Sequence, residues 1–218
     1  MQHPSVLILC SGGLKSTFLT TLATKEVRDV KLLFVNHEQV NYDRERSAVM
    51  NIAQHFNIPW DELVLIEALP KGWPPLKLTA FLWAALMYAR HHEYYEVYFG
   101  PSEDDYRPEA TLKYISELKN LLDTVQPEFT KTGQLADKVK LQAPCIKLTE
   151  ERILRYGQTL KVPWNIAWSC DKANRHHCGT CPSCVRRQLA FDRAKLTDPS
   201  FYITPYVELR RRKCIIKN

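Results

Sequence analysis

The chain has 218 residues, of which 45% are hydrophobic and 25% are charged, a composition typical of a globular domain with a full core. No apolar run approaches the roughly 20 residues of a membrane span, and residues 1–4 lack the features of a signal peptide. We therefore expect a cytoplasmic protein with no membrane partner. The net charge of +6 suits an anionic ligand, and the dense basic run at residues 210–213 is typical of a solvated tail, which disfavours a nucleic-acid partner.

Apolar runs alternate with segments of helical spacing along the first half of the chain. The runs predict strands at residues 6–10, 30–35, 63–66 and 97–100. The helical spacing predicts helices at residues 16–25, 44–56, 79–91 and 107–125. This alternation predicts an α/β fold with a parallel, Rossmann-like sheet and right-handed crossovers.

The pattern changes near residue 126 to loops and short helices that end in a cysteine cluster. We assign residues 1–125 to a nucleotide-binding α/β core and residues 126–218 to a C-terminal helical, zinc-binding region, packed together as one domain. Ligands of parallel sheets bind at the carboxyl ends of the strands. The polar segments after Cys10, Val35 and Gly100 belong at that edge.

A glycine turn follows the first predicted strand, in the sequence Ser11-Gly12-Gly13-Leu14-Lys15-Ser16-Thr17. Glycines let a backbone approach phosphate oxygens, and the next helix offers unpaired N–H groups and a positive dipole end. A standard nucleotide-triphosphatase loop is excluded, because it needs glycines where this chain has Leu9 and Leu14. The turn predicts a phosphate site; a glycine turn without a ligand is the alternative.

Four of the seven cysteines lie close together, as Cys170-x7-Cys178-x2-Cys181-x2-Cys184. Such spacing lets four thiolates complete the tetrahedral shell of a structural zinc ion, with no open position for water. A redox dithiol and an iron–sulfur centre are the alternatives. The scattered Cys10, Cys145 and Cys214 are expected to be small buried hydrophobic residues.

The glycine turn resembles the SGGxDS loop of the PP-loop ATP pyrophosphatases of the HUP class. The segment from Trp168 to Cys170, followed by His177 to Arg187, resembles the zinc signature of the 7-cyano-7-deazaguanine synthases (QueC). Further similarity covers residues 147–157 and 198–202. On these motifs the chain is identified as a divergent member of the QueC family of queuosine biosynthesis.

The resemblance implies an ATP-dependent ligase. In this family ATP adenylates 7-carboxy-7-deazaguanine, ammonia displaces AMP to give an amide, and a second ATP activates the amide for dehydration to the nitrile. The implied cofactors are ATP, magnesium and structural zinc. The implied partners are the deazapurine carboxylate, ATP and ammonia or a protein amine, and a homodimer is left open.

The resemblance also implies roles for particular residues. The expected ATP-binding residues are Cys10, Ser11, Gly12, Gly13, Leu14, Lys15, Ser16, Thr17, Phe34, Val35, Asn36 and Gly100. The expected substrate-binding residues are Glu103, Asp104, Asp105, Arg107 and Arg187. Of these, the three acids would suit either magnesium or the edge of the substrate base. The expected catalytic residues are Lys15, Lys77 and Arg107. An ordinary acidic loop is the alternative for residues 103–105, and a solvated arginine opening a helix is the alternative for Arg107.

Two departures from the family pattern bear on activity. Lys15 stands where the family has aspartate, and Lys77 stands where it has arginine, which loses the forked donor geometry. Three alternatives remain open. The altered pocket suits an enzyme of an antiviral defence system that joins a deazapurine to a protein amine, and Lys15 favours a nucleotide-binding module without catalysis. The shared loop and the cysteines would also suit a tRNA-thiolating relative. The last of these needs a reactive cysteine, for which Cys145 is the candidate.

Overall fold

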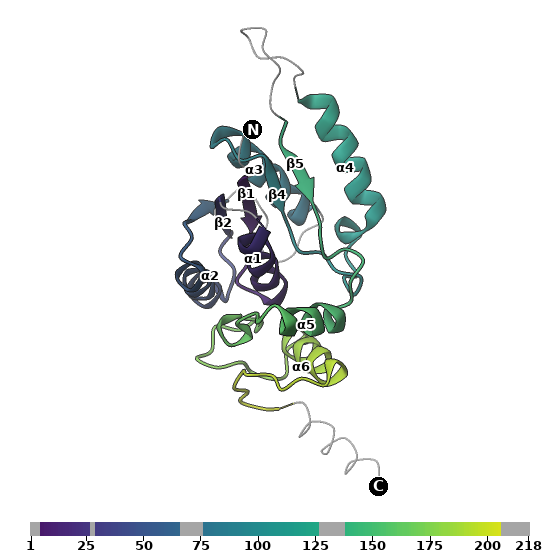
Figure 1. The fold of residues 1–218 in the computed structure, drawn as a ribbon. Helices are drawn as coiled ribbons and strands as arrows, with labels where there is room; N and C mark the ends of the chain where they lie inside the picture. Colours follow the sequence, from purple (N-terminus) through teal and green to yellow (C-terminus); the bar gives the residue numbers. More distant parts are fainter. Residues whose placement is uncertain (1–4, 27–28, 66–75, 127–137, 206–218) are drawn as a thin grey trace.

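The computed structural model describes residues 5–26, 29–65, 76–126 and 138–205 (Figure 1). A five-stranded sheet in the order β3-β2-β1-β4-β5 forms its centre. All four neighbouring pairs of strands are parallel, which confirms the predicted α/β class. The strands are β1 (Ser5–Leu9), β2 (Asp29–Asn36), β3 (Trp60–Val64), β4 (Glu96–Tyr98) and β5 (Lys140–Gln142).

Helices cover both faces of the sheet. The α-helices are α1 (Leu14–Glu26), α2 (Tyr42–Phe56), α3 (Lys77–His91), α4 (Leu112–Val125), α5 (Glu150–Thr159) and α6 (Pro182–Ala194), with 3-10 turns at Pro108–Ala110 and Trp164–Ile166. Strand residues point alternately to the two faces. Val6 and Ile8 of β1 therefore pack with α1, α2, α5 and α6, whereas Leu7 packs with α3 and α4. A sheet buried on both faces explains the apolar runs.

Three elements differ from the sequence-based prediction. β3 begins at Trp60 rather than at residue 63, because this edge strand is only half-buried and its residues WDELV carry two acids. α4 begins at Leu112, where the Thr111 hydroxyl accepts a hydrogen bond from the N–H of Tyr114, rather than at residue 107. β5 was missed because only Leu141 of its three residues is buried, which leaves no apolar run.

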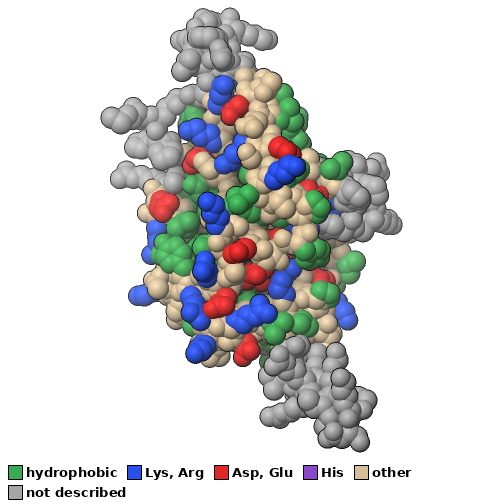
Figure 2. All heavy atoms as spheres, turned by 90° about the vertical axis from the view of Figure 1, so that its right-hand side faces the viewer, with side chains coloured by type: hydrophobic (Ala, Val, Ile, Leu, Met, Phe, Trp, Pro, Cys, Tyr) green, Lys and Arg blue, Asp and Glu red, His purple; other side chains and the backbone are tan. Residues whose placement is uncertain are grey.

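The C-terminal helices lie beside the sheet at one end of the molecule. Figure 1 shows α5 and α6 together below the sheet, and α5 also packs against α1. None of the helices in the described ranges has the length and apolarity to cross a membrane. On the face drawn in Figure 2, lysine and arginine side chains are interspersed with acidic ones rather than gathered in one patch.

Candidate nucleotide and metal site

The glycine turn connects the end of β1 to the start of α1 in a conformation that only glycine adopts easily. Gly12 has a φ of 74°. A Cβ atom at Gly12 would lie 2.7 Å from the Cβ of Ala48 and 2.9 Å from the carbonyl oxygen of Glu45. The turn is thus pressed directly onto α2, and its backbone position is fixed by that contact.

The hydroxyl groups at the start of α1 are engaged by the turn itself. The Ser16 hydroxyl donates to the carbonyl of Gly13 at 3.1 Å, and the Thr17 hydroxyl donates to the same carbonyl at 2.9 Å. Thr17 is fully buried. In this arrangement, the groups left to hold an anion are the backbone N–H groups at the helix N-terminus, together with the helix dipole.

The turn lies where the strand order reverses, between β1 and β4, which is the usual ligand crevice of such sheets. A cleft of about 570 Å³ opens there. Gly100, after β4, passes so close that an added Cβ would lie 3.0 Å from the Cβ of Lys15. Of the predicted residues, the cleft is lined by Cys10, Ser11, Gly13, Leu14, Lys15, Ser16, Phe34, Val35, Gly100, Asp105, Arg107 and Arg187.

The other predicted residues lie outside the lining of this cleft: Gly12, Thr17, Asn36, Lys77, Glu103 and Asp104. The Asn36 amide donates to Glu62 at 2.8 Å, on β3. Lys77 is buried at the first position of α3, with its ammonium 5.7 Å from the centroid of the Phe81 ring. Burial lowers the pKa of Lys77, against the attraction of Glu45.

Lys15 is enclosed by acidic side chains rather than exposed to the cleft as an isolated charge. Its ammonium lies 2.6 Å from a carboxylate oxygen of Asp105 and 3.5 Å from one of Glu150. Arg107 contacts the other oxygen of Asp105 at 2.8 Å. Burial alone would raise the pKa of Asp105, but Lys15 and Arg107 outweigh it and lower the pKa to about 2.

Several residues that line the cleft were not predicted: Glu150, Trp168, Ser169, His37, Phe81 and Glu45. Glu150 is the first residue of α5, and the hydroxyl of Thr149 before it caps the helix. The threonine followed by two glutamates could therefore have identified this helix start from the sequence. Trp168 and Ser169 adjoin the first cysteine of the cluster. Glu45 gave no signal, because a carboxylate on a polar helix face is ordinary; burial raises its pKa here.

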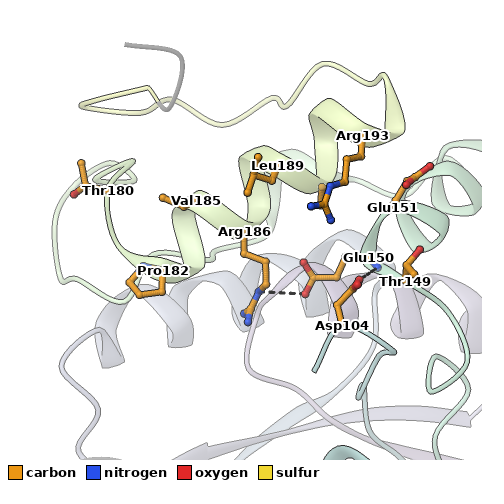
Figure 3. Close-up of a pocket in the computed structure, with 11 residues that line it drawn as sticks. Asp104, Thr149, Glu150, Glu151, Thr180, Pro182, Val185, Arg186, Leu189 and Arg193 are labelled. Atoms are coloured by element: carbon orange, nitrogen blue, oxygen red, sulfur yellow. Dashed lines mark hydrogen bonds and ion pairs between the residues drawn. The ribbon is translucent and has the colours of Figure 1, made fainter. Parts of the chain in front are cut away.

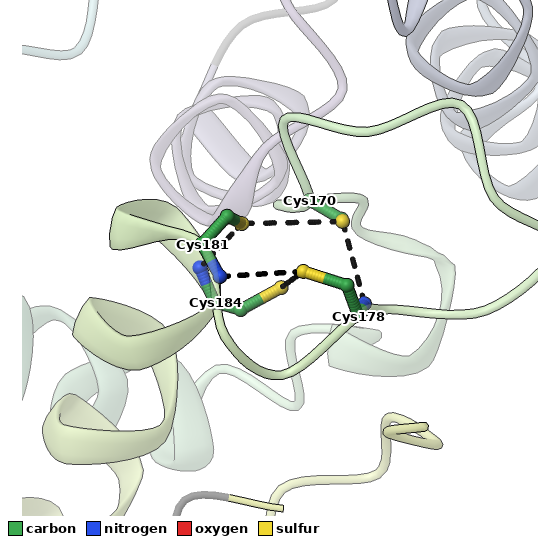
Figure 4. A group of neighbouring side chains, drawn as sticks. All are labelled: Cys170, Cys178, Cys181 and Cys184. Carbon is green, nitrogen blue, oxygen red and sulfur yellow. Dashed lines mark hydrogen bonds between the residues drawn. The ribbon is translucent and has the colours of Figure 1, made fainter. Parts of the chain in front are cut away.

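The four clustered cysteines converge on one point (Figure 4). All four are buried, and their sulfur atoms lie within 4.8 Å of one another. The Sγ atoms of Cys178 and Cys184 are 3.9 Å apart, and those of Cys181 and Cys170 are 4.0 Å apart. Metal–sulfur bonds of about 2.3 Å at tetrahedral angles require sulfurs about 3.8 Å apart. The four residues therefore fit a metal ion.

Backbone N–H groups point at the sulfurs of this cluster. Those of Thr180 and Cys181 donate to the sulfur of Cys178 at 3.4 and 3.3 Å. Burial raises the pKa of Cys178, but these hydrogen bonds outweigh it and bring the pKa to about 6. The surrounding backbone thus favours the thiolate form of Cys178, which metal binding needs. Burial instead raises the pKa of Cys181 to about 11 and also raises that of Cys184.

The cysteine cluster and the glycine turn are joined by direct hydrogen bonds. The N–H of Trp168 donates to the carbonyl of Gly12 at 2.8 Å. The Asn41 amide, at the start of α2, donates to the carbonyl of Cys170 at 2.9 Å. Because both bonds lead from the cluster to the turn or to the helix behind it, the metal-binding segment braces the glycine turn.

Arg187 supports the same segment from inside. Its side chain is 1% exposed, and it donates to the carbonyls of Ala167 and Trp164 at 2.8 and 3.0 Å. It also donates two hydrogen bonds to one oxygen of Asp198, at 3.2 and 3.0 Å. Arg187 touches the cleft, but its guanidinium is committed to these protein partners.

The scattered cysteines match the expectation within the described residues. Cys10 and Cys145 are buried, and Cys214 lies outside the described ranges. Burial raises the pKa of Cys10 to about 11 and that of Cys145 to about 12. A thiol with such a pKa is a poor nucleophile, which disfavours Cys145 as a thiolation residue.

Together these features define an α/β protein with a glycine turn after its first strand and, bonded to that turn, four cysteines that could hold a metal ion. We call the glycine turn at residues 11–17 the phosphate turn, after its predicted ligand. The chain matches the model of the family described as "Queuosine biosynthesis protein QueC", over residues 5–71 and 63–195. It belongs to the QueC family.

Known proteins similar to this chain carry the same family name. The 7-cyano-7-deazaguanine synthase of Methanothrix thermoacetophila is 30% identical over 89% of this chain and 96% of that protein. The 7-cyano-7-deazaguanine synthase of Coxiella burnetii (strain RSA 331) is 29% identical over 91% of this chain and 97% of that protein. Among solved structures, an NMN synthetase from Francisella tularensis matches with a TM-score of 0.45 and 15% identity over 93% of this chain and 90% of that one.

Proposed function

We propose that this chain is an ATP-dependent ligase that adenylates 7-carboxy-7-deazaguanine and passes the activated acid to an amine. With ammonia the product is the amide and then the nitrile, 7-cyano-7-deazaguanine. The observation that carries this proposal is the phosphate turn at the β1–β4 switch point, in a chain of the QueC family. Relatives named 7-cyano-7-deazaguanine synthase align with nearly the whole chain, which supports the same chemistry here.

The proposed first step joins the carboxylate oxygen of the substrate to the α-phosphorus of ATP, with pyrophosphate as leaving group. The N-terminus of α1 holds the departing β- and γ-phosphates through backbone N–H groups. Phe34 and Val35, at the end of β2, line the side of the cleft where adenine is proposed to bind. The attacking amine then forms the C–N bond as AMP leaves. Positioning and charge neutralisation supply most of the acceleration in such reactions.

Lys15 is proposed to be the cation that balances pyrophosphate. Its ammonium is 2.6 Å from Asp105, so it is held at the mouth of the turn by a salt bridge. An ammonium group forms charge-assisted hydrogen bonds with phosphate oxygens as it does with a carboxylate, and Lys15 is proposed to contact both. Magnesium, when bound with ATP, would neutralise further charge, and Asp105 is the best-placed acid for it.

Arg107 is proposed to bind the carboxylate of the substrate. It lines the cleft and is aligned by Asp105 at 2.8 Å. Zinc is the proposed occupant of the cysteine site, where four sulfurs leave no position for a reacting group. Its proposed role is therefore to hold the segment that braces the phosphate turn.

The test is incubation of purified protein with ATP, 7-carboxy-7-deazaguanine and ammonium chloride. We expect AMP, pyrophosphate and a product with the mass of the amide or nitrile. Lys15→Met should abolish release of AMP, whereas Lys25→Met, on the exposed end of the same helix, should not. ATP binding by calorimetry without any AMP release would support a binding module instead and overturn the ligase.

A further inference from the structure

A second cavity lies between α5 and α6, outside the cleft of the phosphate turn (Figure 3). Its volume is about 460 Å³. We name it the α5–α6 cavity; it is lined by Asp104, Thr149, Glu150, Glu151, Thr180, Pro182, Val185, Arg186, Leu189, Ala190 and Arg193. Glu150, Pro182 and Arg186 line both this cavity and the phosphate cleft, so the two spaces share a wall.

Glu150 forms the centre of that shared wall. Its carboxylate oxygen lies 3.3 Å from Arg186 and 3.5 Å from Lys15 of the phosphate turn. The Glu150 side chain is 9% exposed, whereas that of Arg186 is 43% exposed. One buried carboxylate thus contacts a cation of each space, and Figure 3 shows Arg186 reaching across the cavity toward it.

The lining of the α5–α6 cavity suits a primary amine. Asp104, Glu150 and Glu151 place three carboxyl groups beside the two guanidinium groups of Arg186 and Arg193, so the acids are in excess by one. Glu150 pairs with Arg186, and Glu151 pairs with Arg155. Val185 and Leu189 of α6 supply apolar surface. Carboxylates attract an ammonium group, and apolar walls accept an alkyl chain. The volume far exceeds the roughly 30 Å³ of a molecule the size of water or ammonia. The cavity therefore has room for an alkylamine.

We propose that the α5–α6 cavity binds the amine that attacks the activated acid, and that this amine reaches the cleft past the Glu150–Arg186 ion pair. This inference rests on the proposed ligase function. An ammonium group bound in the cavity first gives one proton to the carboxylate of Glu150, which frees the lone pair of the nitrogen. The nitrogen then attacks the acyl carbon, a C–N bond forms, and the C–O bond to phosphate breaks as AMP leaves with the electron pair. The nitrogen becomes cationic and acidic on attack, and its second proton passes to solvent.

A substitution that fills the cavity tests amine binding separately from the adenylation step. Leu189→Trp narrows the α5–α6 cavity from α6, and Leu121→Trp on the exposed face of α4 is the matched control. The first readout is exchange of labelled pyrophosphate into ATP, which needs the deazapurine acid but no amine. The second readout is the KM for ammonium and for n-butylamine, a mimic of a lysine side chain, in product formation.

We expect Leu189→Trp to keep the exchange rate and to raise the KM for accepted amines by about tenfold or more, the change expected for a blocked pocket. Turnover of butylamine points to a side-chain acceptor, and turnover of ammonium alone points to free ammonia. Normal exchange with an unchanged amine KM overturns the cavity's role and leaves the ligase standing. Wild-type protein without exchange overturns both. If Leu189→Trp does not fold, Val185→Phe fills the same cavity and is judged by the same readouts.

Discussion

The N–H of Trp168 donates a 2.8 Å hydrogen bond to the carbonyl of Gly12. Trp168 lies two residues before Cys170, the first cysteine of the cluster. The metal-binding segment is therefore bonded to the backbone of the phosphate turn itself. A substitution at the cysteines should therefore displace the phosphate turn and weaken nucleotide binding, although no cysteine of the cluster contacts a nucleotide in the proposed mechanism.

Loss of the metal is predicted to unfold the segment at residues 168–184, which carries the four cysteines and is hydrogen-bonded to the phosphate turn. Structural zinc sites of four cysteines contribute several kcal/mol to folding, so Cys184→Ser should lower Tm by more than about 10 °C. It should also weaken ATP binding, through the Trp168–Gly12 bond. Metal content by mass spectrometry, calorimetric Tm and the ATP Kd measure these effects. Cys145→Ala, at a buried cysteine outside the cluster, should keep its metal; an unchanged ATP Kd in metal-free Cys184→Ser would contradict the brace.

Gly12→Ala is predicted to strain the turn. The φ of 74° and the 2.7 Å approach to the Ala48 Cβ leave no space for a methyl group. The expected cost is roughly 1–3 kcal/mol in the free energy of unfolding, with weaker ATP binding. Urea titration measures the first effect and calorimetry the second. Gly13→Ala is the control for stability, because the nearest atoms to an added Cβ there lie at 3.6 Å; an equal loss of stability in both variants would refute the predicted strain.

Lys15→Met is predicted to raise the pKa of Asp105 from about 2 toward its ordinary value of 3.8. Burial already pushes this pKa upward, and removal of the ammonium leaves Arg107 and the N–H of Ser102 to oppose it. Carboxyl carbon NMR shifts followed from pH 2 to 7 measure the change. The same titration of Lys25→Met should match the wild type. An Asp105 pKa that stays near 2 without Lys15 would show that the salt bridge does not control it.

The direction of this pKa shift also predicts a pH dependence of stability. The folded pKa of Asp105 lies below the unfolded one, so ionised Asp105 stabilises the fold above about pH 4 and loses that effect as the pH falls toward 2. In Asp105→Asn this loss should be missing, which gives a shallower fall in the free energy of unfolding over that range. Parallel wild-type and variant curves from pH 4 to 2 would contradict it.

Arg187→Met is predicted to destabilise the protein by about 3–5 kcal/mol, because it removes the buried guanidinium that pairs with the half-buried Asp198 and leaves two backbone carbonyls without their donor. Arg187→Lys should not rescue stability, since one ammonium cannot reproduce the fork that joins Asp198 to two carbonyls. Arg152→Met on the exposed face of α5 is the control. Urea titration decides the outcome. A stable Arg187→Met protein with a raised KM for the deazapurine acid alone would instead assign Arg187 to the substrate.

The sequence by itself predicted the parallel α/β fold, which the structure confirms, and it located the glycine turn and the four cysteines whose sulfur atoms converge. These features are local: a glycine turn between a strand and a helix, and thiols spaced closely enough to meet on one ion. Only the tertiary structure decided that Lys15 forms ion pairs with Asp105 and Glu150, and that Arg187 is buried with its guanidinium hydrogen-bonded to protein groups. Such contacts join residues far apart in the chain, so they depend on how the helices pack on the sheet. No spacing in the sequence encodes them.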